Sequence, residues 1–313
     1  MESIPTNPIL EFNTNQLKLV RKQYNLDKPG EMSRAIDVLE AWVKMQNHFT
    51  KKEFPRFFLE NVIITSKGSL ERAKQRLDKI CTFRTAMPAF FGDNLMHCKV
   101  DDLDNIFNSM ILPKPTQENY RVFFMKCVGS TFTSELLLTC YRYIVLMCEY
   151  VMAYDYSDGV VIVIDYSEAN ILELVKSLNL TDLRQIIAIT TEGFGMRLKE
   201  IHLITPSKAI ETLVTLLKQF LSPKIGKRIC THKDTSTLFQ FVPKDLFPME
   251  YGGKEKCLEK LRDEVKIEVT GKAFINYIEE INKAKTDESC RQTDTFNEHY
   301  LGMPGSFRTL TVD

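Results

Sequence analysis

The seven residues from Gly159 to Asp165, with the sequence GVVIVID, constrain the fold of this chain more than any other segment. The run is apolar and β-branched throughout, without the alternation of a strand that has one wet face, so it predicts a strand covered on both faces. Three further segments, at 121–128, 201–204 and 228–231, also have strand character, and helical segments separate them. This alternation predicts an α/β fold with a mainly parallel sheet flanked by helices.

The N-terminal third has a different pattern and is predicted to be all-helical. Residues 33–46 and 69–84 carry apolar side chains at helical spacing, and Ser33 is placed to cap the first of these helices. Met87-Pro88 ends the second pattern because proline removes a backbone donor.

Residues 134–154 are nearly apolar all round and are long enough to cross a membrane. Arg142 and Glu149 interrupt this stretch two turns apart on one face, and each is costly in hydrocarbon. A helix buried in protein and partly facing a cavity fits the stretch better than a membrane span.

The segment 206–221 is a helix that Thr205-Pro206 starts and Ser222-Pro223 ends. Two interpretations are open: a crossover helix packed on the sheet, or a flap that closes a cavity and touches a membrane when open. Five cations flank the segment: Arg197, Lys199, Lys224, Lys227 and Arg228. Each is worth about 1 kcal/mol near an anionic bilayer, which favours the flap.

Bulk properties exclude several classes of function. Lys+Arg and Asp+Glu both number 41, so the net charge is zero, which argues against a nucleic-acid binder acting through bulk charge. The eight cysteines form no C-x-x-C pair and are expected to be reduced thiols rather than disulfides or zinc ligands. The first residues contain no signal-peptide core, so we expect a cytoplasmic protein.

Motifs of catalysis are absent or incomplete. Gly193-x-Gly195 lacks the third glycine of a dinucleotide loop, and neither a Walker sequence nor a G-x-S-x-G elbow occurs. His202 lies mid-strand among apolar neighbours and is expected to be a satisfied core histidine. Asp165 ends a strand where catalytic groups of α/β folds are found, but capping the following turn is the simpler role. We expect neither an enzyme nor a cofactor.

Several segments resemble the CRAL-TRIO lipid-binding family. They are 159–165, 194–204, 220–229 and 246–253, in the order the family has them, while 70–91 resembles its helical N-terminal domain. The tail at 304–313 is similar to the arthropod branch, often labelled α-tocopherol transfer protein-like or clavesin-like. The resemblance implies three parts: an all-helical domain at 1–98, the lipid-binding domain at 99–270 and a C-terminal extension at 271–313.

The resemblance further implies a lipid cage shut by a mobile helix, with no catalysis. Its ligand would be a tocopherol, retinoid, carotenoid or phosphoinositide. The matching lid positions are Ile210, Leu213, Val214 and Leu217, and the matching cage-wall positions are Val160, Ile164, Ile189, Thr190 and Ile201. Tyr141, Cys148 and Thr190 are candidates for contacting a ligand head group.

The family's phosphoinositide cluster matches Arg197, Lys199, Lys224 and Arg228, and Lys227 lies beside them. These matches predict a protein that transfers a hydrophobic lipid between membranes, associates with them transiently, and releases its ligand at an anionic phosphoinositide. A phosphoinositide-sensing adaptor in membrane traffic is the alternative. Gly195 stands where the family commonly has proline, which predicts a looser loop.

Overall fold

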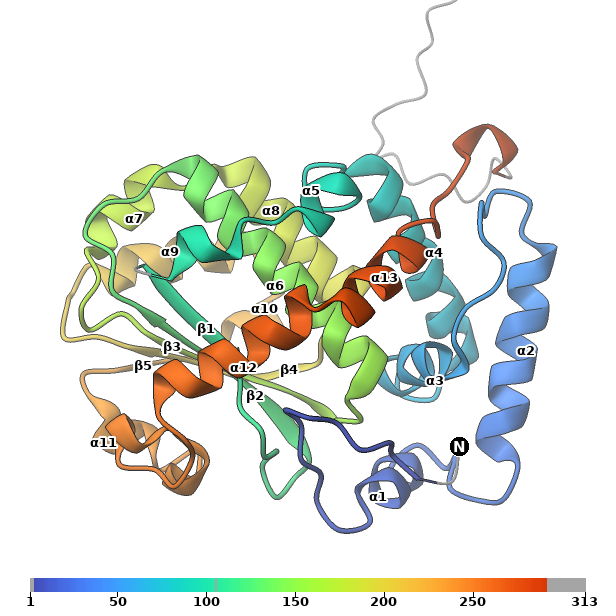
Figure 1. Cartoon of the computed structure of the whole chain (residues 1–313), viewed down its shortest axis with the longest axis horizontal. Coiled ribbons are helices and arrows are strands. Elements are labelled where there is room, and N and C mark those ends of the chain that lie inside the picture. The colour runs from blue at the N-terminus through green and yellow to red at the C-terminus, as the bar shows by residue number, and fades with distance from the viewer. Residues whose placement is uncertain (1–2, 105, 292–313) are drawn as a thin grey trace, which may run out of the picture.

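The computed structural model describes residues 3–104 and 106–291, and it contains one five-stranded sheet in the order β1-β2-β3-β4-β5 (Figure 1). The strands are β1 (Phe107–Ile111), β2 (Tyr120–Cys127), β3 (Gly159–Asp165), β4 (Leu198–Ile204) and β5 (Ile229–His232). β1 pairs antiparallel with β2, and all other pairs are parallel. The predicted mainly parallel α/β sheet is confirmed.

β3 is the central strand and coincides with the predicted apolar run. Val160, Ile162 and Ile164 share one of its faces because side chains alternate along a strand. Register continues this face across the sheet, since Ile162 lies opposite Phe123 on β2 and Ile201 on β4. β1 was not predicted, because its FNSMI sequence is short and mixes polar with apolar residues.

Helices surround the sheet and gather in two groups (Figure 1). α1 to α4 lie together at one end of the molecule, and α7 and α9 lie at the other. The helices are α1 (Gln16–Lys22), α2 (Glu31–Met45), α3 (Arg56–Thr65), α4 (Leu70–Ala86), α5 (Asp93–Met96), α6 (Ser134–Tyr154), α7 (Ile171–Ser177), α8 (Leu180–Ala188), α9 (Ile210–Phe220), α10 (Pro223–Gly226), α11 (Thr235–Leu238), α12 (Leu258–Thr270) and α13 (Lys272–Ile281).

α6 is a core helix of the α/β part. Its N-cap Thr133 accepts a hydrogen bond from the Leu136 amide at 3.1 Å. Within residues 3–104 and 106–291 it is the one helix long and apolar enough to cross a membrane, yet most of its side chains are buried inside the protein. The prediction of a helix buried in protein is confirmed, and Glu149 on it is fully buried beside Arg84.

Two predicted helix starts were wrong. α2 begins at Glu31 after Gly30, whose φ of 78° suits glycine, so Ser33 lies inside the helix rather than at its cap. α9 begins at Ile210, four residues after Pro206, because the Thr205 hydroxyl accepts from the Ser207 amide at 3.2 Å and closes a turn instead. A polar residue before an apolar stripe marks a cap only when its backbone geometry allows it.

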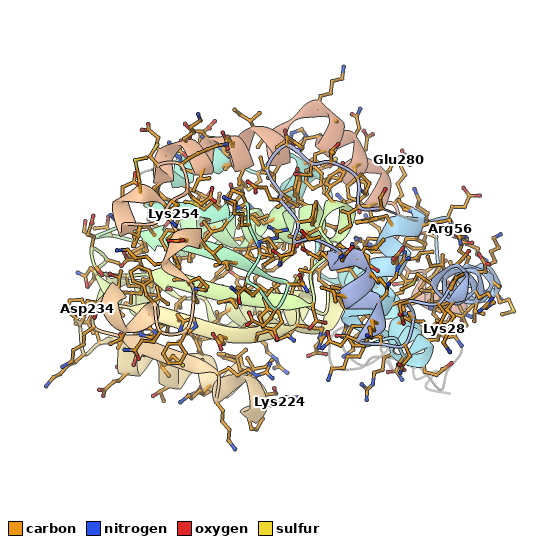
Figure 2. The ribbon with its side chains drawn as sticks, turned by 90° about the horizontal axis from the view of Figure 1, so that it is seen from below. Lys28, Arg56, Lys224, Asp234, Lys254 and Glu280 are labelled. Carbon is orange, nitrogen blue, oxygen red and sulfur yellow. The ribbon has the colours of Figure 1, made fainter. Side chains whose placement is uncertain are left out.

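The C-terminal helices run back over the molecule. α12 packs along β1, where Arg262 donates to the Asn108 side chain at 3.0 Å. Beyond α13, the Thr286 amide donates to Thr85 of α4 at 2.8 Å. Figure 2 places Lys254 and Glu280 on the opposite side of the molecule from Lys224. The three-part division stays a prediction, and the tail at 304–313 lies outside the described residues.

Candidate functional site

A cavity of about 240 Å³ lies between the sheet and the helices α6, α7, α8 and α9. Its floor is the face of the sheet that carries Val160, Ile162 and Ile164. α6 contributes a stripe at i, i+3, i+4 and i+7 spacing that includes Leu137, Tyr141 and Ile144. The cavity exists because two apolar surfaces meet without filling the space between them.

The wall of this cavity is uncharged. Among the described residues that line it, none is an acid, a base or an amide. The lining side chains that carry oxygen or a thiol are Ser109, Cys140, Tyr141, Cys148, Tyr166 and Thr190. Such a wall suits an apolar guest with few polar atoms.

Seven of the eleven predicted ligand-contacting residues line the cavity: Tyr141, Cys148, Val160, Ile164, Thr190, Leu213 and Leu217. The other four do not: Ile189, Ile201, Ile210 and Val214. Ile189 is fully buried in a π-helical turn, η2 (Ile189–Gly193), that packs on α4. That any of the eleven binds a ligand stays a prediction.

Most of the lining residues were missed by sequence reasoning, and three of them show why. Ile162 follows from the alternation that already placed Val160 and Ile164 on one face, so the signal was present. Tyr166 comes directly after β3 and Ser109 lies on the unpredicted β1. Neither position carries a pattern that marks it before the strands are assembled.

Two of the five predicted phosphoinositide-binding cations are engaged by an internal carboxylate. Asp158, whose side chain is 3% exposed, pairs with Lys199 at 2.9 Å and Arg197 at 2.5 Å and also accepts from the Tyr24 hydroxyl. The Arg197 guanidinium lies 5.2 Å from the Tyr24 ring centroid, and the Lys199 ammonium 4.2 Å from that of Tyr120. Burial, with the nearby Arg228 charge, lowers the pKa of Arg197.

The other three cations lie at or near α10. Lys224 and Lys227 are exposed, and within the described part of the chain neither makes an ion pair. Figure 2 shows Lys224 at the outer edge of the molecule. Arg228 is half-buried and donates to the Leu198 carbonyl. The structure therefore divides the predicted cluster into three parts: a pair engaged by Asp158, the exposed pair Lys224 and Lys227, and Arg228, which the backbone holds.

Comparison with known proteins matches this region to one family. Residues 108–253 match the CRAL/TRIO domain, and the five strands, α6 and α9 all lie within or at the edge of that range. Residues 108–253 of this chain are a CRAL/TRIO domain. The arthropod branch within the family stays a prediction.

Relatives of this chain are distant. "Alpha-tocopherol transfer protein-like" from Mus musculus is 23% identical over 230 residues, covering 72% of this chain and 66% of that protein. The protein of the same name from Homo sapiens is also 23% identical, and the alignment covers 67% of its length. Clavesin-1 from Xenopus laevis is 31% identical over 97 residues, or 31% of this chain and 29% of clavesin. The crystal structure of Sfh5 aligns with 15% identity and a TM-score of 0.46, covering 80% of this chain and 91% of Sfh5.

The loop before β4 was predicted to be loose because it carries Gly195, but this loop is closely packed. Gly195 has a φ of 66°, and a Cβ there would lie 1.9 Å from the Arg76 guanidinium carbon. Only glycine fits this backbone and this contact together. Burial, with the nearby Arg72 charge, lowers the pKa of Arg76 to about 10. The loop is thus packed against α4.

His202 and Asp165 lie outside the cavity wall. His202 is fully buried, with one ring nitrogen 2.9 Å from His232 and the other 2.9 Å from Glu200. The predicted satisfied core histidine is confirmed. Asp165 accepts from the Ser167 amide at 2.8 Å and from the Tyr251 hydroxyl at 2.6 Å, so its carboxylate serves a turn and a tertiary contact.

Proposed function

We propose that this protein binds a small hydrophobic lipid, such as a tocopherol, retinoid or carotenoid, and carries it between membranes without a chemical step. The observation that carries this proposal is the uncharged cavity between the sheet and α9 inside a CRAL/TRIO domain. The names of the tocopherol-transfer-like relatives are consistent with the same role.

Binding would be driven by removal of apolar surface from water. A lipid that hides on the order of 500 Å² of apolar surface gains roughly 12 kcal/mol, as an upper value before the entropy costs of binding. Escape into water would then be slow. An acceptor that stabilises an open form of the protein is needed for release.

We expect α9 to provide that open form at a bilayer. Ile210 and Leu213 are buried, whereas Val214, Leu217 and Phe220 are only partly buried, so the helix is held on the sheet by a few side chains. An anionic membrane, a phosphoinositide above all, would attract Lys224 and Lys227 beside it. The protein would be cytoplasmic and peripheral, staying on membranes only briefly.

A transfer assay with charge reversal tests the proposal. The double variant Lys224→Glu/Lys227→Glu is expected to bind a fluorescent retinoid normally but to transfer it about tenfold more slowly to vesicles containing phosphatidylinositol bisphosphate. Transfer to neutral vesicles should be unchanged. Lys28→Glu, an exposed reversal near α1, is the matched control and should transfer like the parent.

Equal transfer rates for the double variant and the parent would contradict the release step. Absence of any transfer by the parent protein would contradict the carrier role itself. We expect reversal at Arg197 to act differently, through misfolding around Asp158, because that cation is engaged internally.

A further inference from the structure

Three hydroxyl groups in the cavity wall have no hydrogen-bond partner within the described residues. They belong to Ser109 on β1, Tyr141 on α6 and Tyr166 directly after β3. These residues are 2%, 9% and 7% exposed, respectively. The Ser109 Oγ atom is buried and unpaired. Buried hydroxyls are nearly always hydrogen-bonded, so three exceptions in one cavity call for a partner that is absent from the folded chain alone.

Other polar groups of the wall do not share this condition. The Thr190 hydroxyl donates to the Ile186 carbonyl at 2.9 Å, so its own helix satisfies it. By contrast, the hydroxyl of Tyr156, buried outside the cavity, donates to Glu60 at 2.5 Å. Two buried hydroxyls outside the cavity, those of Ser66 and Tyr277, also lack a partner within the described residues. The three in the wall differ from them in lining the space where a guest would lie.

The two unpaired tyrosines are close enough to interact. Tyr166 interacts electrostatically with Tyr141 and with Cys140, which also lines the cavity. Burial raises the pKa of both tyrosines, so both hydroxyls stay protonated and able to donate. Ser109 lies on β1, on the same face of the sheet as Met125 and Ile164.

The character of the wall restricts which head group these hydroxyls receive. A carboxylate or phosphate here would lose its hydration without meeting a cation, because the described lining residues carry none. An uncharged hydroxyl or carbonyl oxygen accepts from neutral donors without that penalty.

We propose that Tyr141, Tyr166 and Ser109 form a polar subsite for an uncharged lipid head group, an alcohol or a carbonyl, and that anionic lipids are excluded from the cavity. This rests on the proposed lipid-binding function. It assigns the phosphoinositide, if one acts, to the outer cations and not to the cavity.

Three probes with one chain length test the subsite: dodecan-1-ol, dodecane and dodecanoate, each displacing a fluorescent lipid from the full chain. The parent protein is expected to bind dodecan-1-ol more tightly than dodecanoate. In Tyr141→Phe/Tyr166→Phe the affinity for dodecan-1-ol should fall about fivefold to tenfold, as expected for one or two lost hydrogen bonds, and that for dodecane should not change.

Controls separate a lost hydrogen bond from a changed cavity. Met147→Leu, another lining substitution of similar volume, should shift all three affinities alike. If the double variant fails to fold, Ser109→Ala replaces it, and a loss of affinity confined to dodecan-1-ol supports the subsite.

The outcomes distinguish this inference from the carrier role. Tightest binding of dodecanoate, or an unchanged affinity for dodecan-1-ol in the tyrosine and serine variants, overturns the subsite and leaves lipid transfer standing. Failure of the parent to bind any of the three probes overturns the subsite and the proposed function together.

Discussion

The two halves of α6 differ in how their polar groups are treated. The first half faces the cavity and presents Tyr141, which has no hydrogen-bond partner within residues 3–104 and 106–291. In the second half, Glu149 pairs with Arg84 at 2.6 Å, and the C-cap Asp155 pairs with Arg121 at 2.7 Å. All four of these ionic side chains are fully buried.

This difference separates a fixed part of the helix from a part that lines the cavity. Two buried ion pairs join the second half to α4 and β2. Breaking either pair would leave an unpaired charge away from water, so the position of this half is fixed. The first half lines a cavity, and α9, which has few fully buried side chains, lines the same cavity. In the proposed function, the fixed end would keep the cavity in shape while the guest exchanges at the other end.

The largest effect is expected from breaking the fixed end. Glu149→Gln leaves the Arg84 guanidinium buried without its carboxylate, which should lower the free energy of unfolding by about 3–5 kcal/mol. Urea unfolding of the purified variant measures this change. The double replacement Arg84→Met/Glu149→Leu should recover most of the loss, since two nitrogens of Arg84 already lack partners. A loss below about 1 kcal/mol in Glu149→Gln would contradict a fixed end.

A pair of tyrosine substitutions compares the two environments directly. Tyr156→Phe removes a hydroxyl that donates to Glu60, so we expect a loss of about 1.5–3 kcal/mol in unfolding free energy. Tyr166→Phe removes a hydroxyl without a partner in the described chain and should change stability by less than about 0.5 kcal/mol. Equal losses in the two variants would mean that Tyr166 is hydrogen-bonded inside the protein.

Filling the cavity should separate binding from stability. Ile162→Trp places a large ring into space that is already empty, so the usual penalty of about 1–3 kcal/mol for overpacking should be largely avoided. Binding of a fluorescent retinoid should be abolished. A melting temperature near that of the parent, with full retinoid binding retained, would show that the lipid binds elsewhere.

The smallest expected effect is a pH dependence of folding stability that comes from His232, on the face of the sheet away from the cavity. Burial, followed by the neighbouring His202, lowers the pKa of His232, while Asp234 opposes the shift. The unfolded chain therefore takes up a proton at His232 before the folded chain does, so stability should fall as pH drops below about 6.5. Glu200 and Thr237 complete the hydrogen-bonded chain.

Thermal melts between pH 7.5 and 5.5 measure this dependence, and His232→Gln should flatten the profile. The same slope in the variant and the parent would assign the effect to other groups. Lipid binding at pH 7.5 should be the same in both proteins, because neither histidine lines the cavity.

Much of the fold could be predicted from short-range patterns of apolar residues in the sequence. The run at β3 identified a doubly covered strand, and α6 was predicted as a buried helix with charges at Arg142 and Glu149. The predicted cap positions at Ser33 and Thr205 were wrong. Capping depends on the backbone geometry at the cap, and a polar residue before an apolar stripe does not reveal that geometry. Alternation on β3 also contained Ile162, which was overlooked.

The sequence by itself determined where apolar side chains fall, and with them the strand β3, the helix α6 and the stripe on α9, because each depends only on spacing along the chain. Tertiary structure decided which polar groups meet partners that lie far away in the sequence. Asp158 engages Arg197 and Lys199 from 39 and 41 residues away, and no local pattern records that pairing. The hydroxyls of Tyr141 and Tyr166 have no partner in the described part of the chain. This too depends on what packs around them, since a hydrogen bond depends on distance in space rather than in sequence.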